Sequence, residues 1–157
     1  MSTDLIQIGA KAPDFILPRN GGESVSLADF AGQPVVLFFY PKASTPGCTT
    51  EACDFSAQGG DFEAAGAAVL GISKDSVKRQ DTFAAKHGLS MPLLSDAEGD
   101  TCERYGVWAE KKNYGRTYMG IVRTTVLIGA DGKVAQVWPK VKVAGHADEV
   151  LAAVRAL

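Results

Sequence analysis

The sequence is poor in the features that mark membrane proteins and nucleic-acid-binding proteins. No apolar run in its 157 residues approaches the length of about 18 residues that indicates a membrane-spanning helix. Residues 1–10 contain no apolar segment typical of a secretory signal. The formal net charge is only −2, and no block of basic residues predicts contact with nucleic acid or a membrane surface. We therefore expect a cytoplasmic protein with neither of these partners.

Histidines and cysteines are also scarce. The chain has two histidines and three cysteines, Cys48, Cys53 and Cys102, and it contains no Cys-x-x-Cys pair. An odd cysteine count without a secretory signal does not describe a structural disulfide framework, so any disulfide is expected to be transient and catalytic. Cys48, Cys53 and a histidine do not have the spacing of a zinc site. We expect no metal and no cofactor.

The order of apolar and polar segments predicts one α/β domain over residues 1–157. Strands are expected at 35–40, 67–73, 92–96, 121–128 and 134–138. Helices are expected at 45–60, 76–87, 101–105 and 146–157. An N-terminal β-hairpin turns at Asn20-Gly21-Gly22, a helical turn is expected at 27–30, and residues 110–116 are predicted to form a charged loop. Because the strands at 35–40 and 67–73 are continuously apolar, they favour a central mixed sheet flanked by helices.

The residues that most clearly indicate a chemical function follow the most apolar run, 35–39. They lie in the segment Tyr40-Pro41-Lys42-Ala43-Ser44-Thr45-Pro46-Gly47-Cys48-Thr49-Thr50-Glu51-Ala52-Cys53. Thr45 is a favourable N-cap and Pro46 suits the first helical position, so a helix is expected to begin here. Cys48 then lies in the first turn, where unpaired N–H groups and the helix dipole favour a thiolate. The dipole contributes only about 0.3–1 kcal/mol, so a full positive charge is needed from elsewhere.

The pattern Pro41-x-x-x-Thr45-x-x-Cys48 resembles the active-site signature of the peroxiredoxins, which are cysteine-dependent peroxidases with a thioredoxin-like fold. Cys53, five positions after Cys48, narrows the resemblance to the peroxiredoxin Q or bacterioferritin comigratory protein branch. The likeness extends from about Ile8 to the C-terminus. It implies a peroxide substrate, a thioredoxin or glutaredoxin-type reductant, and a monomer.

The resemblance also implies roles for individual residues. Cys48 would attack a peroxide oxygen and become a sulfenic acid, which Cys53 would resolve as an intramolecular disulfide. Residues five apart in an intact helix have Cα atoms about 8.6 Å apart, whereas a disulfide tolerates at most about 6.8 Å. Disulfide formation would therefore require the first turns to unwind. The residues implied to hold the peroxide or shield the thiolate are Pro41, Thr45, Gly47 and Arg123.

Arg123 lies in the predicted apolar strand 121–128, where its permanent charge needs an anionic partner. One explanation is a salt bridge to a carboxylate such as Glu51 or Asp54. The other is the Cys48 thiolate, for which Arg123 would supply the charge that the dipole lacks. Both interactions can exist together, with Glu51 orienting the guanidinium.

Several residues keep a simpler alternative role. The alternative for Thr45 is that it serves only as a helix cap. The alternative for Pro41 and Gly47 is that they serve only to form the turn. For Cys53 the alternative is a packed helical residue. Cys102, which no motif surrounds, is interpreted as a small buried residue, with a resolving thiol as its alternative.

Three functions are consistent with a reactive Cys48: a peroxidase with an antioxidant role, a thiol-disulfide reductase, and a non-enzymatic redox sensor. The lack of Cys-x-x-Cys argues against the reductase. A sensor shares the first chemical step with a peroxidase and differs by reacting once without turnover. We expect the peroxidase, acting on hydrogen peroxide and organic hydroperoxides.

Overall fold

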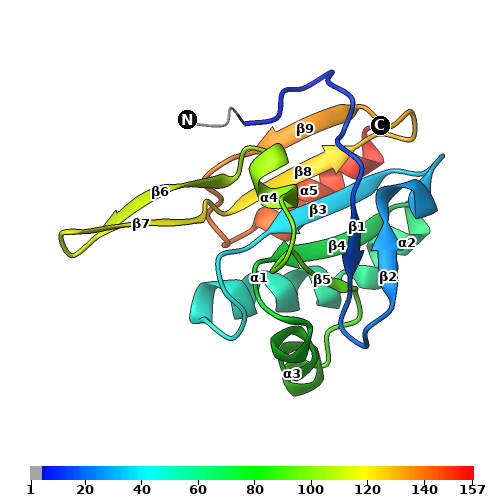
Figure 1. Ribbon diagram of the computed structural model, residues 1–157. Coiled ribbons are helices and arrows are strands. Elements are labelled where there is room, and N and C mark those ends of the chain that lie inside the picture. The colour runs from blue at the N-terminus through cyan, green and yellow to red at the C-terminus, as the bar shows by residue number, and fades with distance from the viewer. Residues whose placement is uncertain (1–4) are drawn as a thin grey trace.

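A five-stranded mixed sheet forms the centre of the computed structural model, which describes residues 5–157 (Figure 1). Its strands, in spatial order, are β5 (Leu93–Ser95), β4 (Ala68–Ser73), β3 (Val35–Phe39), β8 (Thr124–Ile128) and β9 (Val134–Trp138). β3, β4 and β5 are parallel, whereas β8 and β9 are antiparallel to their neighbours. All five residues of β3 are apolar and buried, so this central strand has both faces covered, as its sequence predicts.

Alternate side chains of β3 belong to two separate cores, one on each face of the sheet. Val36 and Phe38 belong to the core formed with α1 (Pro46–Ala57), α2 (Gly59–Ala64) and α5 (His146–Arg155). Leu37 and Phe39 belong to the opposite core. There they pack with the N-terminal hairpin, β1 (Ile16–Pro18) and β2 (Ser24–Ser26), and with α4 (Thr101–Arg104), all of which lie in front of the sheet in Figure 1.

The remaining predicted helices are also present. Residues 27–30 form the 3₁₀ helix η1 (Leu27–Phe30). α3 (Val77–His87) packs beside β5; the Ser76 side chain caps its N-terminus and Gly88 ends it in the left-handed conformation. α2 was not predicted, because Gly59 and Gly60 were interpreted as the end of the preceding helix. No helix within residues 5–157 is long and apolar enough to cross a membrane.

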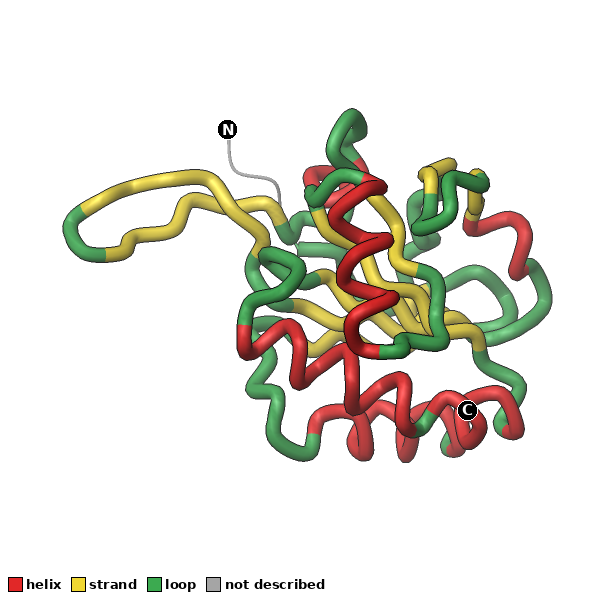
Figure 2. Tube along the Cα trace, turned by 90° about the horizontal axis from the view of Figure 1, so that it is seen from below, coloured by secondary structure: helices red, strands yellow, loops and turns green. Residues whose placement is uncertain are grey.

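The predicted loop at 110–116 was wrong. β6 (Trp108–Asn113) and β7 (Arg116–Ile121) form an antiparallel hairpin that projects from the domain (Figures 1 and 2). Four of the six β7 residues are exposed, so this hairpin lacks the polar–apolar alternation that identifies a half-buried strand from sequence. The turn is at Tyr114 and Gly115, which have φ values of 50° and 76°.

The predicted strand 121–128 was also wrong in one respect, because two strands share it. Ile121 ends β7 and Thr124 begins β8, so Val122 and Arg123 lie in the connection between them. The Arg123 carbonyl accepts a hydrogen bond from the Val141 N–H (2.9 Å) instead of joining the β3–β8 ladder. This break places Arg123 near the carboxyl-terminal end of β3, beside the loop that leads to α1.

Candidate active site

The loop 40–45 leads from the carboxyl-terminal end of β3 into α1. Thr45 is the N-cap residue, with extended backbone (φ −84°, ψ 154°), and Pro46 is the first helical residue, as predicted. The Thr49 N–H donates to the Thr45 carbonyl at 2.9 Å. The N–H groups of Gly47 and Cys48 precede this bond, so the helix itself offers them no acceptor. Cys48 therefore lies in the first turn, at the positive end of α1.

Arg123 contacts both of its predicted partners. Its Nη2 donates to Cys48 Sγ at 3.4 Å, and its Nη1 donates to Glu51 Oε1 at 2.8 Å. The Cys48 residue is only 1% exposed, so the charge of Arg123 is weakly screened by water at this sulfur. A positive charge at this distance stabilises a thiolate relative to a thiol.

Glu51 lies three residues after Cys48 on α1 and is 1% exposed. Burial raises the pKa of the Glu51 carboxyl to about 7, although the charge of Arg123 and the hydrogen bond from it oppose this rise. Within the described residues, Glu51 Oε2 has no hydrogen-bond partner. The carboxyl group therefore orients the guanidinium through one oxygen and keeps the other available inside the site.

Glycine at position 47 has a steric reason. A Cβ placed there would lie 3.1 Å from Arg123 Nη2, closer than most real Cβ contacts. The absent side chain lets the guanidinium approach the first turn of α1 and keeps the backbone accessible. Gly47 thus contributes to the contact between Arg123 and Cys48.

The Thr45 hydroxyl does not cap the helix. It donates to the Lys42 carbonyl at 2.7 Å, within the loop, and makes no side-chain cap bond. Its position is that of an N-cap, but the capping alternative for its hydroxyl is wrong in this conformation. Pro41 lies half-buried at the start of the same loop.

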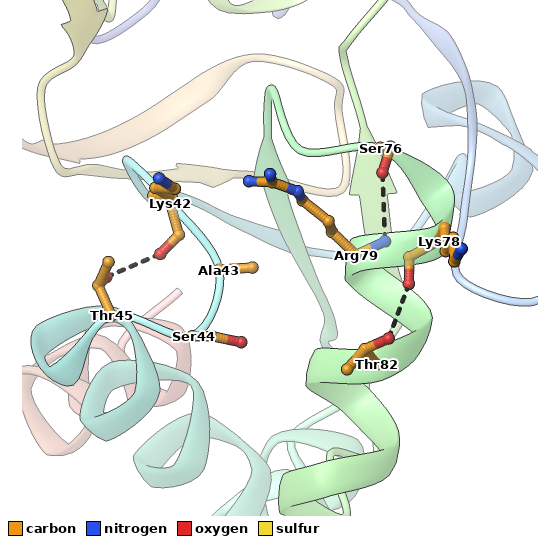
Figure 3. Close-up of a pocket in the computed structure, with 8 residues that line it drawn as sticks. All are labelled: Lys42, Ala43, Ser44, Thr45, Ser76, Lys78, Arg79 and Thr82. Atoms are coloured by element: carbon orange, nitrogen blue, oxygen red, sulfur yellow. Dashed lines mark hydrogen bonds between the residues drawn. The ribbon is translucent and has the colours of Figure 1, made fainter.

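A cavity of about 660 Å³ lies between this loop and α3 (Figure 3). Arg79 extends from α3 toward Lys42 across it. The residues that line the cavity are Lys42, Ala43, Ser44, Thr45, Ser76, Lys78, Arg79 and Thr82. Thr45 therefore contacts this open space on one side and begins the Cys48 helix on the other.

The three thiols are all free and have different surroundings. Cys53 is half-buried in α1, which is continuous from Pro46 to Ala57. Cys102 is fully buried on α4, in the core on the other face of the sheet from Cys48. Burial raises the pKa of the Cys102 thiol well above its usual value, and the charge of Asp96 reinforces this rise. The structure therefore supports Cys102 as a buried structural residue.

Sequence reasoning missed Asp75. Its carboxylate accepts a hydrogen bond from the Ala43 N–H at 2.7 Å, in the middle of the loop that precedes Cys48. A signal existed, because Asp75 is the second residue after the end of β4, and β4 is parallel to β3. The carboxyl ends of parallel neighbours meet at the same edge of a sheet, so Asp75 and the Cys48 loop had to lie close together.

Comparison with known proteins decides the family. The model of the AhpC/TSA family matches residues 8–137. This chain belongs to that family, the peroxiredoxins. "Putative peroxiredoxin bcp" of Coxiella burnetii is 51% identical over 93% of the chain and 97% of its own length. "Peroxiredoxin Bcp" of Xanthomonas campestris is 47% identical over 99% of the chain and 98% of its own length.

Solved structures support the same branch of the peroxiredoxins. The bacterioferritin comigratory protein of Xanthomonas campestris superposes with a TM-score of 0.88 at 48% identity, covering 96% of each chain. The predicted thioredoxin-like fold and the Bcp/peroxiredoxin Q resemblance are thus confirmed. This peroxiredoxin is a thiol peroxidase by family, and the Cys48–Arg123 contact is the feature of its structure suited to that chemistry.

Proposed function

We propose that this peroxiredoxin reduces hydrogen peroxide and organic hydroperoxides with Cys48, forms a Cys48–Cys53 disulfide within one chain, and is recycled by thioredoxin or a similar reductant. The contact of 3.4 Å between Arg123 Nη2 and Cys48 Sγ, at the start of α1, carries this proposal. It joins a permanent cation to a buried sulfur at the position where the helix also favours an anion.

In the first step, the Cys48 thiolate attacks one peroxide oxygen and the O–O bond breaks. The sulfur takes that oxygen as a sulfenic acid, while the other oxygen takes a proton and leaves as water or an alcohol. Negative charge moves from the sulfur to the departing oxygen. The Arg123 guanidinium and the N–H groups of Gly47 and Cys48 are hydrogen-bond donors that can stabilise this charge as it moves to the departing oxygen.

Thr45 adds a hydroxyl to the same place. In the structure this hydroxyl donates to the Lys42 carbonyl, which lies in the same loop. Because a hydroxyl has one donor and two acceptor positions, it can accept a hydrogen bond from a peroxide O–H without losing its bond to Lys42. Rotation about χ1 would make it a donor to the peroxide instead.

In the second step, the Cys53 thiolate attacks the Cys48 sulfur, forms the disulfide and releases the sulfenic oxygen as water with one added proton. Cys53 and Cys48 both lie in the intact helix α1, where residues five apart have Cα atoms separated by about 8.6 Å. A disulfide needs at most about 6.8 Å, so the start of α1 must unwind. A dithiol reductant then reduces this disulfide by thiol–disulfide exchange, is itself oxidised to a disulfide, and restores both thiols.

Organic hydroperoxides are included in this proposal for two reasons. The X. campestris bacterioferritin comigratory protein is described for its alkyl peroxide reduction activity. In this chain, the cavity beside Thr45 has room for the substituent of an alkyl hydroperoxide, and alanine and the methylene groups of Lys42 and Arg79 contribute apolar surface to it.

Steady peroxide consumption with thioredoxin, thioredoxin reductase and NADPH tests the proposal. The wild-type protein should turn over many times, Cys48→Ser should consume no peroxide, and Cys53→Ser should lose thioredoxin-supported turnover after a single oxidation. Cys102→Ser is the matched control and should behave as the wild type. A single burst without turnover in the wild type would indicate a sensor, and disulfide reduction without peroxide consumption would indicate a reductase.

A further inference from the structure

A buried carboxylate that takes no part in the peroxide reaction holds the loop that precedes Cys48 in the chain. Asp75, which is 8% exposed, accepts the Ala43 N–H with Oδ2 at 2.7 Å. Ala43 is itself buried and lies two residues before the N-cap of α1. The contact therefore joins the β4–α3 connection to the segment that presents Thr45 and Cys48.

Asp75 is in turn fixed by a chain of buried hydrogen bonds. The Ser73 hydroxyl donates to Asp75 Oδ2 at 2.7 Å and accepts from Gln80 Nε2 at 3.0 Å. Gln80 accepts from the Tyr40 hydroxyl at 2.5 Å and donates to the Leu94 carbonyl at 2.9 Å. The ends of β3 and β4, together with α3 and β5, thus determine where the Asp75 carboxylate lies.

The loop has little else to hold it in place. Ser44, directly after Ala43, has φ = 66°, in the left-handed region that residues other than glycine rarely adopt. The Thr45 hydroxyl bonds only within the loop, to Lys42. Among the described residues, Asp75 provides the one hydrogen bond from a side chain elsewhere in the fold to residues 41–45. A strained conformation persists only when its surroundings hold it, and here Asp75 does so.

We infer that Asp75 is a positioning residue that acts through Ala43 to keep the Cys48 loop in the conformation that reacts with peroxide. This inference rests on the proposed function, in which the same segment must also unwind for Cys53 to reach Cys48. Loss of the Asp75 contact would favour the unwound conformation. It would therefore slow the reaction of Cys48 with peroxide but would not slow the formation of the disulfide.

The test separates these two steps. Fully reduced Asp75→Ala is mixed with one equivalent of hydrogen peroxide, and quenched samples are analysed by mass spectrometry for sulfenic acid and for disulfide. Oxidation of Cys48 should be about tenfold slower than in the wild type, because a buried hydrogen bond to a charged group is lost. The rate constant of disulfide formation should be equal to that of the wild type or higher.

Asp96→Ala is the matched control. Asp96 is also a buried carboxylate that accepts backbone N–H groups, from Thr101 and Cys102, but it holds α4 on the other face of the sheet. Its loss should leave the rate of Cys48 oxidation close to that of the wild type. Equal slowing of oxidation in the two variants, or slowing of both steps in Asp75→Ala, would overturn the inference by showing a general structural effect.

Asp75→Asn keeps the test decisive if Asp75→Ala does not fold. The asparagine retains an acceptor for the Ala43 N–H but loses the charge, so oxidation should be slower than in the wild type, by a factor of less than about ten. A wild-type rate of oxidation in Asp75→Asn, with no folded alanine variant, would overturn the inference. A wild-type protein that does not consume peroxide would instead refute the proposed function itself.

Discussion

At the scale of single residues, the decisive feature is one arginine shared between two acidic groups. Arg123 has a mostly buried side chain (18% exposed) and divides its planar fork between Glu51 and Cys48. A lysine could not make this divided contact, because its ammonium is a compact point charge. Glu51 thus orients the guanidinium whose positive charge lies beside the Cys48 sulfur.

The raised pKa of Glu51 makes the stability of the protein depend on pH. Burial raises it from 4.5 to about 7, so the folded state holds this proton more tightly than the unfolded state. The resulting stabilisation is fully present below pH 4.5 and is lost as the pH rises through about 7. A shift of this size corresponds to about 3 kcal/mol. Between pH 4.5 and pH 8, the free energy of unfolding of the wild type should therefore fall by up to about 3 kcal/mol relative to that of Glu51→Gln.

Urea unfolding of the reduced proteins at pH 4.5 and pH 8 measures this difference, because all other titrating groups are shared by the two proteins. Glu63→Gln, at an exposed position on α2, is the control for removal of a carboxylate. A free-energy difference between wild type and Glu51→Gln that is the same at both pH values would contradict the assignment.

The sequence placed the candidate site residues better than the residues that support them. Cys48, Thr45 and Gly47 are neighbours in the chain, so a local pattern was enough to place them at the start of a helix. Arg123 stood out because a permanent charge in an apolar segment needs an anion, but Glu51 and Asp54 could not be separated without coordinates. Asp75 was missed because its partner is a backbone N–H; its place after β4 predicts that it lies near the loop, but not which group it binds there.

At the scale of elements, the N-terminus of α1 lacks capping contacts that would resist unwinding, although Arg123 contacts Cys48 and Glu51 there. Thr45 occupies the N-cap position without capping through its side chain, and no acidic residue lies in the first turn. The later part of the helix is better fixed, because Phe55 stacks on Phe38 of β3 with ring centroids 4.7 Å apart. Opening is therefore expected to start at the N-terminal end and to reach Cys53 before Phe55 leaves the core.

We predict that one equivalent of hydrogen peroxide accelerates amide hydrogen exchange selectively in residues 45–53. The Cys48–Cys53 disulfide cannot form in the intact helix, so the oxidised protein must lose protection there by about tenfold or more. Exchange in α5, which packs against α1, should change less because its contacts with the sheet remain. Exchange in residues 45–53 that is equal before and after oxidation would show that this disulfide does not form.

The success of the element predictions followed the amount of apolar burial. β3 and β4 were found because their runs are apolar and the sheet is covered on both faces. β6 and β7 were missed because a projecting hairpin gains little from burial, so its sequence is free to be charged. The break at Val122 and Arg123 was missed because the residues on either side of it, Ile121 and Thr124, are both buried strand residues.

At the scale of the whole molecule, the central sheet separates the thiols into two compartments. Cys48 belongs to the core under α1, α2 and α5, and Cys102 to the core under the N-terminal hairpin and α4. Strand β3, with all of its residues buried, lies between these cores. A Cys48–Cys102 disulfide would have to join residues on opposite faces of the sheet, whereas Cys53 is on the same helix as Cys48. This separation favours Cys53 over Cys102 as the proposed resolving thiol.

The same separation predicts how the thiols respond to iodoacetamide. In the reduced native protein, Cys48 and Cys53 should both be alkylated, because local opening of α1 exposes them. Cys102 should react at least about a hundredfold more slowly, since it is fully buried and the raised pKa of its thiol leaves little thiolate. Peptide mapping by mass spectrometry measures the three rates, and labelling in urea provides the control in which all three thiols react.

After one equivalent of peroxide, Cys48 and Cys53 should both resist alkylation, and Cys102 should remain a free thiol that reacts in urea. Rapid native labelling of Cys102, or its protection together with Cys48 after oxidation, would disprove the separation of the thiols and with it the choice of Cys53.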